Sequence, residues 1–171
     1  MPKVRSLSPA EALAAVPALA DVLIDCVHSG ASVGFMAPLS RATAEEFWRG
    51  VASGVAAGSR ILLVAEVDER IAGTVQVVFA GAENQPHRAD IAKMLVHGSA
   101  RRRGLGAALL QAAEAEAKRA GRSVLVLDTH AGSAADHLYA SHGWVRVGII
   151  PNYALMPVEG YCDTMFFYRH L

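Results

Sequence analysis

The segment Ser99–Gly106, which reads SARRRGLG, decides how this chain is expected to fold. It follows HRADIAKMLVH (residues 87–97), an apolar and β-branched stretch that predicts a strand. It precedes residues 104–120, where apolar and charged residues recur at helical spacing and predict an amphipathic helix that Gly121 ends. A turn rich in arginine and glycine is therefore expected to connect a strand to a helix.

Such a turn is suited to bind an anion. The free backbone N–H groups at a helix N-terminus attract negative charge, and glycine lets the backbone approach a phosphate closely. Arg101, Arg102 and Arg103 add donors for charge-assisted hydrogen bonds. A diphosphate is a suitable ligand, and an exposed basic turn that binds nothing is the alternative.

Two familiar phosphate-binding motifs fit this turn poorly. A nucleoside triphosphate loop requires Gly-Lys-Ser/Thr, whereas Gly104 and Gly106 lead into two alanines. A dinucleotide-binding motif gains support from Asp128, about twenty residues later, but Leu109 occupies its third glycine position. A Rossmann-like dinucleotide binder therefore remains only as an alternative. No basic stripe or aromatic platform accompanies the arginines, so a nucleic-acid partner is not expected.

The part of the chain before this turn predicts helices followed by a meander of strands. After a strand at residues 3–7, Ser8, Pro9 and Glu11 form a capping box, and the helix is expected to run toward Gly30 with a bend at Pro17. A second capping box, Thr43 with Glu46, predicts another helix that ends near Gly58. Residues 60–68 and 70–80 predict a hairpin, and residues 87–97 add a third antiparallel strand.

The part after the turn predicts a strand, a short helix and two more strands. The strand spans residues 123–130, Ser133 and Asp136 open the helix, and Gly143 ends it. The last strands are expected at residues 144–150 and 161–170. The fold class is thus α/β (α+β), with a mixed, mostly antiparallel central sheet flanked by helices, in a single domain of residues 1–171.

Composition and charge exclude several classes of protein. The 171 residues are 53% hydrophobic, so a disordered chain is not expected. They carry 16 basic and 16 acidic side chains, so a protein that binds membranes or anionic polymers through a basic surface is not expected either. Cys26 and Cys162 form no metal or disulfide pattern, which favours a reduced, cytoplasmic protein. Residues 10–24 contain charges and a proline, so neither a membrane span nor a signal peptide is expected. The seven histidines include no HExxH motif, and no metal is expected.

Arg101, Gly104 and Gly106 match the pattern [QR]xxGx[GA], and with this match the chain resembles the GCN5-related N-acetyltransferase (GNAT) family. KMLV (residues 93–96) before the turn, and Tyr139 before Gly143 and Trp144, extend the resemblance over nearly the whole chain. More narrowly, the chain resembles the branch with the tabtoxin-resistance acetyltransferases. The stretches that carry this narrower resemblance are VHSGASVGFM, KMLV, SARRRGLG, LDT and GSAADHLYA.

The resemblance implies a GNAT-like acyl-CoA N-acyltransferase fold and acetyl-CoA (coenzyme A) as co-substrate. It also implies that backbone groups of Leu95 and Val96 contact the pantetheine arm and the acetyl carbonyl, where two strands splay apart. Gly132 stands where many members of the family carry an asparagine that contacts the cofactor. The residues expected to hold the diphosphate are Arg101, Arg102, Arg103, Gly104, Leu105 and Gly106.

Acetylation of an amine also requires a base and an acid. An amine of pKa about 10.4 costs roughly 4.6 kcal/mol to deprotonate at pH 7. Asp128, at the end of its strand, is the first candidate base, and Asp90 is the second. Tyr139 is the candidate that stabilises and protonates the leaving thiolate, and the Val96 N–H is the candidate that polarises the acetyl carbonyl. The structural alternatives are a turn cap for Asp128, surface pairing of Asp90 with Arg88 or Lys93, and simple packing for Tyr139.

The expected function is acetyl transfer from acetyl-CoA to a primary amine of a small molecule, by direct attack through a tetrahedral intermediate. An amino-acid-like toxin or antibiotic is one such acceptor. Acceptor specificity is expected to depend on residues 28–36 and 152–161, and the oligomeric state stays open. The alternative from another class is a non-catalytic acyl-CoA-binding regulatory module.

Overall fold

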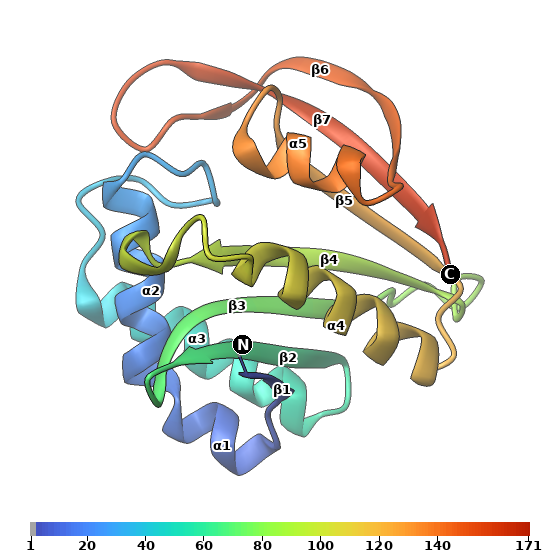
Figure 1. Ribbon diagram of the computed structural model, residues 1–171, viewed down its shortest axis with the longest axis horizontal. Helices are drawn as coiled ribbons and strands as arrows, with labels where there is room; N and C mark the ends of the chain where they lie inside the picture. Colours follow the sequence, from blue (N-terminus) through green and yellow to red (C-terminus); the bar gives the residue numbers. More distant parts are fainter. Residues whose placement is uncertain (1–2) are drawn as a thin grey trace.

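The computed structural model describes residues 3–171, which form one sheet and the helices on its two faces (Figure 1). The elements follow the order β1 (Lys3–Ser6), α1 (Pro9–Ala14), α2 (Val16–His28), α3 (Arg41–Ala56), β2 (Arg60–Val67), β3 (Arg70–Phe79), β4 (Arg88–Val96), η1 (Gly98–Ala100), α4 (Leu105–Arg119), β5 (Val124–His130), α5 (Ala134–Ser141), β6 (Val145–Leu155) and β7 (Tyr161–His170). Within these residues, no helix combines the length and the hydrophobicity needed to span a bilayer.

The strands form a seven-stranded sheet in the order β1-β2-β3-β4-β5-β7-β6. All neighbours are antiparallel except β4 and β5, which are parallel. The expected meander is present as β2, β3 and β4, and the turn of its first hairpin consists of Asp68 and Glu69, both with positive φ. The predicted mixed, mostly antiparallel sheet with flanking helices is therefore confirmed.

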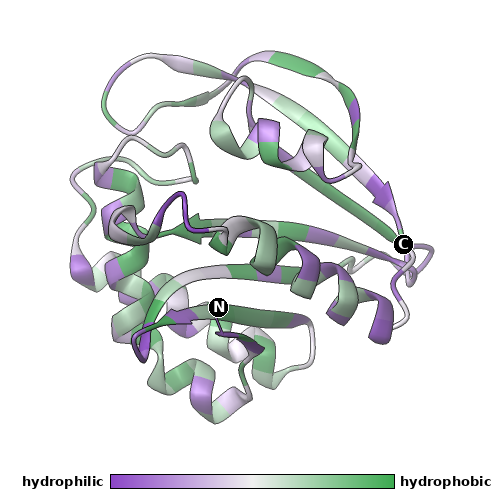
Figure 2. Cartoon of the chain, in the orientation of Figure 1, coloured by the Kyte–Doolittle hydropathy of each residue, from purple (hydrophilic) through white to green (hydrophobic). Residues whose placement is uncertain are grey.

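Each face of the sheet has its own hydrophobic core. On one face α1, α2 and α3 pack through residues such as Leu23 and Trp48 against Leu62 of β2. On the other face α4 and α5 pack through residues such as Leu109 against Leu125 of β5 and Phe167 of β7. The strands between the two helical layers are predominantly hydrophobic (Figure 2), as expected when both faces of a sheet are covered.

The N-terminal helix differs from the sequence-based expectation. The capping box is confirmed, because Ser8 Oγ accepts from Glu11 N–H and the Glu11 carboxylate accepts from Ser8 N–H. The single helix bent at Pro17 is wrong: α1 ends at Ala14 and α2 begins at Val16. Pro17 has no N–H to donate to the preceding turn, and it stands in the first turn of α2, where proline is tolerated.

Two further boundaries differ from the prediction. The capping box of Thr43 with Glu46 is wrong, because the N-cap of α3 is Ser40, three residues earlier, with Oγ 3.1 Å from Thr43 N. Serine and threonine both favour the N-cap, so the sequence alone did not separate the two positions. Strand β6 is also longer than expected and extends to Leu155.

Strands β4 and β5 separate along their length, and this separation positions the candidate site. Their parallel pairing joins only Arg88–Asp90 to Val124–Val126. Beyond these residues β4 continues to Val96 and β5 to His130, and the two strands diverge (Figure 1). On the side of the splay, the last six residues of β4 thus have no paired strand.

Candidate active site

Val96 directs its backbone toward the splay. It pairs with Gly73 of β3, and the next residue, His97, donates its N–H to the Ala72 carbonyl at 2.8 Å. Along an antiparallel pair of strands, residues that bond to the partner strand alternate with residues whose N–H and C=O point away from it. Because His97 bonds to β3, its neighbour Val96 is of the second kind. The Val96 N–H and C=O therefore face the side from which β5 has withdrawn. Leu95, one residue earlier, is buried in the core beneath α2 and α3.

The turn between β4 and α4 is held by side chains from the turn itself and from α2. Asp25 of α2 accepts the Gly98 N–H at 2.7 Å. The Arg101 guanidinium donates to the Val96 carbonyl at 3.1 Å and lies 3.9 Å from the Asp25 carboxylate. Arg102 and Arg103 are exposed, and Arg102 has a positive φ of 60°. The predicted arginines thus lie together at one end of β4.

The N-terminus of α4 lacks a side-chain cap. Serine side chains cap α1, α3 and α5, whereas the N-cap of α4 is Gly104, with φ 78°. The first four N–H groups of a helix have no partner within the helix, so those at 104–107 remain available to a ligand. A Cβ at Gly106 would lie 3.2 Å from Leu138 Cδ2 of α5, so this glycine also permits close packing of the two helices.

Asp128, Asp90 and Lys93 lie on the same face of the sheet, at the splay. Leu125 and Leu127 of β5 point into the core beneath α4, so the alternate residue Asp128 points to the opposite face. Asp90 also alternates with core residues of that layer, Ala89 and Ile91, and its charge reaches Asp128. Asp90 is paired with Arg88 at 2.7 Å, which is the structural alternative expected for it.

The charge state of Asp128 is set by its surroundings. Partial desolvation by the protein raises the pKa of Asp128, and the nearby Asp90 charge acts in the same direction, while the ammonium of Lys93 opposes the shift. A carboxylate whose pKa lies above its ordinary value is a stronger base than an ordinary aspartate. Of the two predicted aspartates, Asp128 therefore has the environment that suits a base.

Tyr139 is buried, with 4% of its surface exposed, and it packs from the opposite face of the sheet. Its ring lies 5.8 Å from the rings of both Trp144 and Phe167. Burial and the charge of Asp128 raise the pKa of Tyr139, so its hydroxyl stays protonated at neutral pH. The charge of Asp128 thus acts on the Tyr139 hydroxyl, although the two side chains come from opposite faces of the sheet. Both predicted roles remain proposals.

Helix α5, which carries Tyr139, is fixed by a buried carboxylate. Asp136 is 6% exposed in its side chain, accepts the Gly132 N–H at 2.7 Å and pairs with Arg146 at 2.8 Å. Gly132 therefore uses its backbone N–H to hold α5. Burial disfavours the charged form of Asp136, but the Gly132 hydrogen bond and the Arg146 charge outweigh it and lower the pKa of this carboxyl.

We expect Asp136→Asn to lower the free energy of unfolding by about 1–3 kcal/mol at pH 7, because it removes a buried charge-assisted pair. Because folding lowers the pKa of Asp136, its negative charge stabilises the folded protein at every pH above the ordinary carboxyl pKa. This stabilisation disappears as the pH falls through the lowered pKa of the folded state. Urea unfolding over a descending pH series measures both effects. Asp163→Asn, which removes one exposed acceptor, is the control. A difference from wild type that does not shrink toward low pH would contradict the prediction.

The two segments expected to determine acceptor specificity lie side by side. The loop between α2 and α3 meets the loop between β6 and β7, where Ala37 N–H donates to the Pro157 carbonyl at 2.8 Å. The Cys162 thiol of β7 lies 3.3 Å from Ser32 Oγ. Both cysteines are free and buried.

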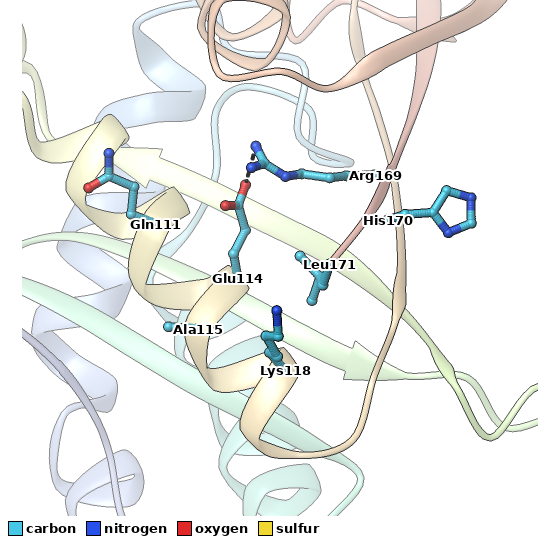
Figure 3. Close-up of a pocket in the computed structure, with 7 residues that line it drawn as sticks. All are labelled: Gln111, Glu114, Ala115, Lys118, Arg169, His170 and Leu171. Carbon is cyan, nitrogen blue, oxygen red and sulfur yellow. Dashed lines mark ion pairs between the residues drawn. The ribbon is translucent and has the colours of Figure 1, made fainter.

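Away from the splay, α4 is tied to the end of β7. A hollow of about 310 Å³ lies there, where the Glu114 carboxylate pairs with Arg169 at 3.2 Å (Figure 3). The same carboxylate accepts from the Trp144 indole at 2.8 Å. A larger groove of about 1390 Å³ runs between α2 and the β2–β3 hairpin and includes Arg103. Neither contains the candidate catalytic residues. Within residues 3–171, no three His, Cys, Asp or Glu side chains are grouped to hold a metal.

Sequence patterns did not single out Lys93 as a member of this cluster. Lysine interrupts an otherwise apolar strand end, DIAKMLV, and this break in the pattern was the available signal. Strand β4 bulges at this point, between the pairs Gln76 with Ala92 and Thr74 with Leu95. A bulge redirects side chains, which strand alternation alone does not predict.

Solved structures that share this fold include acetyltransferases. A ribosomal-protein-alanine N-acetyltransferase from Brucella melitensis superposes with a TM-score of 0.80 at 23% identity, over 99% of both chains. The Salmonella typhimurium protein yncA, solved with its cofactor acetyl-CoA, superposes with a TM-score of 0.81 at 18% identity, over 100% of this chain and 94% of that chain. These similarities establish the fold.

The family follows from the sequence comparisons. The model of the acetyltransferase (GNAT) domain matches residues 58–146, just over half of the chain. An uncharacterized N-acetyltransferase encoded in the hisH-hisA intergenic region of Azospirillum brasilense is 38% identical over 112 residues, and the match spans 64% of this chain and 65% of that protein. The chain belongs to the GNAT acetyltransferase family. The predicted family is confirmed, and the narrower branch stays a prediction.

Proposed function

We propose that this protein transfers the acetyl group of acetyl-CoA to a primary amine of a small molecule in the cytoplasm, with residues 1–171 acting as one domain. The class of acceptor that we favour is an amino-acid-like toxin or antibiotic. The observation that carries the proposal is the uncapped N-terminus of α4 beside the splayed backbone of β4. This pairing of an anion site with free strand groups suits a ligand that is a diphosphate at one end and an extended amide chain at the other.

The residues of the turn fit the donor. Backbone N–H groups from Arg101 to Gly106 would hold the diphosphate, with the guanidinium groups of the exposed Arg102 and Arg103 adding charge. The outward C=O of Val96, which also accepts from Arg101, would accept a hydrogen bond from an amide of the pantetheine arm. The donor supplies an activated acetyl group, and the protein supplies its orientation.

The charged groups at the splay supply the chemistry. Asp128 would take a proton from the acceptor ammonium, directly or through water, and so free the lone pair that attacks the acetyl carbonyl. The Val96 N–H would stabilise the negative charge that develops on the carbonyl oxygen. Tyr139 would donate a hydrogen bond to the departing sulfur. A thiol has an ordinary pKa near 8.5, below that of Tyr139, so transfer of the tyrosine proton to the thiolate is unfavourable. Tyr139 would therefore act mainly through the donated hydrogen bond.

Tyr139→Phe is expected to lower kcat by roughly 10- to 100-fold, because the departing thiolate loses a donated hydrogen bond. Its affinity for coenzyme A is expected to stay within about twofold, since the buried ring is retained. Thiol release and calorimetric titration measure the two quantities. An unchanged kcat would remove Tyr139 from the mechanism.

Release of free thiol from acetyl-CoA in the presence of a panel of amines tests the proposed function. The panel contains small primary amines, amino acids and a peptide with an N-terminal alanine, since one structural relative is a ribosomal-protein-alanine N-acetyltransferase. Release with a small amine supports the proposal, and release with the peptide alone overturns the small-molecule acceptor. Binding of coenzyme A without release would favour the silent regulatory module, and protection by NAD alone would favour the dinucleotide binder.

A further inference from the structure

Lys93 places a positive charge on the face of the sheet that carries Asp128. It lies in the bulge of β4 and has a positive φ of 50°. Its ammonium lies 5.7 Å from the centroid of the Phe47 ring of α3. A Cβ built at Gly34, in the loop between α2 and α3, would lie 3.7 Å from the same nitrogen. The ammonium is therefore enclosed by α3, this loop and the splay.

The Lys93 ammonium has no counter-charge in direct contact. Among residues 3–171, no carboxylate lies within 4.0 Å of its nitrogen. Asp90 is held by Arg88, and Asp128 is close enough to act on Lys93 but does not pair with it. Desolvation lowers the pKa of Lys93, which shows that its isolation from water carries a cost. A partly desolvated charge in a protein is normally paired or neutralised, whereas the Lys93 ammonium has no opposite charge in direct contact.

We propose that Lys93 binds a carboxylate of the acceptor, so that the acceptor carries both the amine to be acetylated and a carboxylate. This inference rests on the proposed function and names a residue that selects the acceptor. Asp128 receives the cationic end and Lys93 the anionic end, and the two groups of the protein stand near each other without pairing. A zwitterionic acceptor would supply each of the two groups with a counter-charge in direct contact.

Aromatic residues flank the charged groups at the splay and would contact an apolar part of the same acceptor. Phe166 of β7 pairs with Asp128 and therefore points to the same face. Its ring lies 5.6 Å from that of Tyr153 in β6, in a T-shaped arrangement. On the other side, Phe35 packs edge-on against Phe47 at 5.2 Å. The charges thus lie between two aromatic pairs.

The test is a binding experiment on the protein saturated with coenzyme A, which prevents turnover. Each amino acid of a panel is titrated beside its carboxamide, which keeps the amine but has no negative charge. We expect the wild type to bind at least one amino acid about 10- to 100-fold more tightly than its amide, the value of a charge-assisted contact. Lys93→Met is expected to abolish that preference, so that the amino acid and its amide bind with similar affinity.

The variants separate a binding role from a structural one. Methionine has nearly the length of lysine and the same Cβ, so it adds no backbone strain at the positive φ. Unchanged affinity of Lys93→Met for coenzyme A verifies that it is folded. Lys93→Arg is expected to keep part of the preference, and Lys3→Met, on the distant edge strand β1, is expected to keep all of it.

The inference is overturned if no member of the panel binds, if no amino acid is preferred over its amide, or if the preference survives Lys93→Met. Thiol release with the same panel distinguishes this failure from failure of the proposed function. Release without a carboxylate preference overturns the role of Lys93 alone. A preference that depends on Lys93, with no release from acetyl-CoA for any amine, overturns the transferase and leaves the carboxylate site.

Discussion

Asp128→Asn is expected to lower kcat by roughly 10²- to 10⁴-fold, the range for loss of a positioned general base. The amide keeps the shape of the side chain but cannot accept a proton from the acceptor ammonium. In the wild type, activity should rise with pH through the raised pKa of Asp128, and this acid limb should disappear in the variant. Initial rates of thiol release over a pH series measure both effects.

Stability measurements separate this role from a structural one. A carboxyl whose pKa is raised by folding destabilises the folded state once the pH exceeds its ordinary pKa, so removal of the charge at pH 7 should not lower the melting temperature. Asp90→Asn is the matched comparison, and its effect on kcat should be smaller because Arg88 already holds that carboxylate. A kcat of Asp128→Asn within threefold of wild type would exclude Asp128 as the base.

Ala107→Glu is expected to weaken coenzyme A binding on the order of 100-fold. Residue 107 lies in the first turn of α4, and a carboxylate there repels the diphosphate that the helix N-terminus attracts. The same carboxylate is favourable for the helix itself, so the melting temperature of the free protein should hold or rise slightly. The affinity for coenzyme A should therefore fall while the melting temperature holds or rises. A folding defect would lower both quantities.

Ala115→Glu is the control for this prediction, because it adds the same charge to an exposed position further along α4. Its affinity for coenzyme A should equal that of the wild type. If Ala107→Glu and Ala115→Glu bind coenzyme A equally well, the ligand does not lie at the start of α4.

Local signals made the elements and the glycine- and arginine-rich turn before α4 predictable. Alternation and β-branching identified β2, β3 and β4, and helical periodicity identified α4 within one residue at each end. The glycines and arginines before α4 indicated an anion site from spacing alone. Asp128 and Tyr139 came from the family resemblance, and the structure adds that the charge of Asp128 acts on the Tyr139 hydroxyl.

Contacts between distant segments were not predictable from local pattern. The hydrogen bond from Gly98 to Asp25 joins residues 73 apart in sequence, and a carboxylate in an amphipathic helix carries no sign of its partner. The bulge at Lys93 is likewise a property of the pairing between β3 and β4 rather than of either strand. For this reason the sequence indicated Lys93 only as part of KMLV and as an alternative to Arg88 for pairing with Asp90 on the surface.

The most direct test of the account is a comparison of coenzyme A with pantetheine by calorimetric titration of the wild-type protein. Pantetheine has the thiol arm that β4 would hold but lacks the diphosphate that the N-terminus of α4 would bind. We expect coenzyme A to bind at least about 100-fold more tightly, and we expect Ala107→Glu to remove most of that advantage. Equal affinities for the two ligands would contradict the assignment of α4 as the diphosphate site.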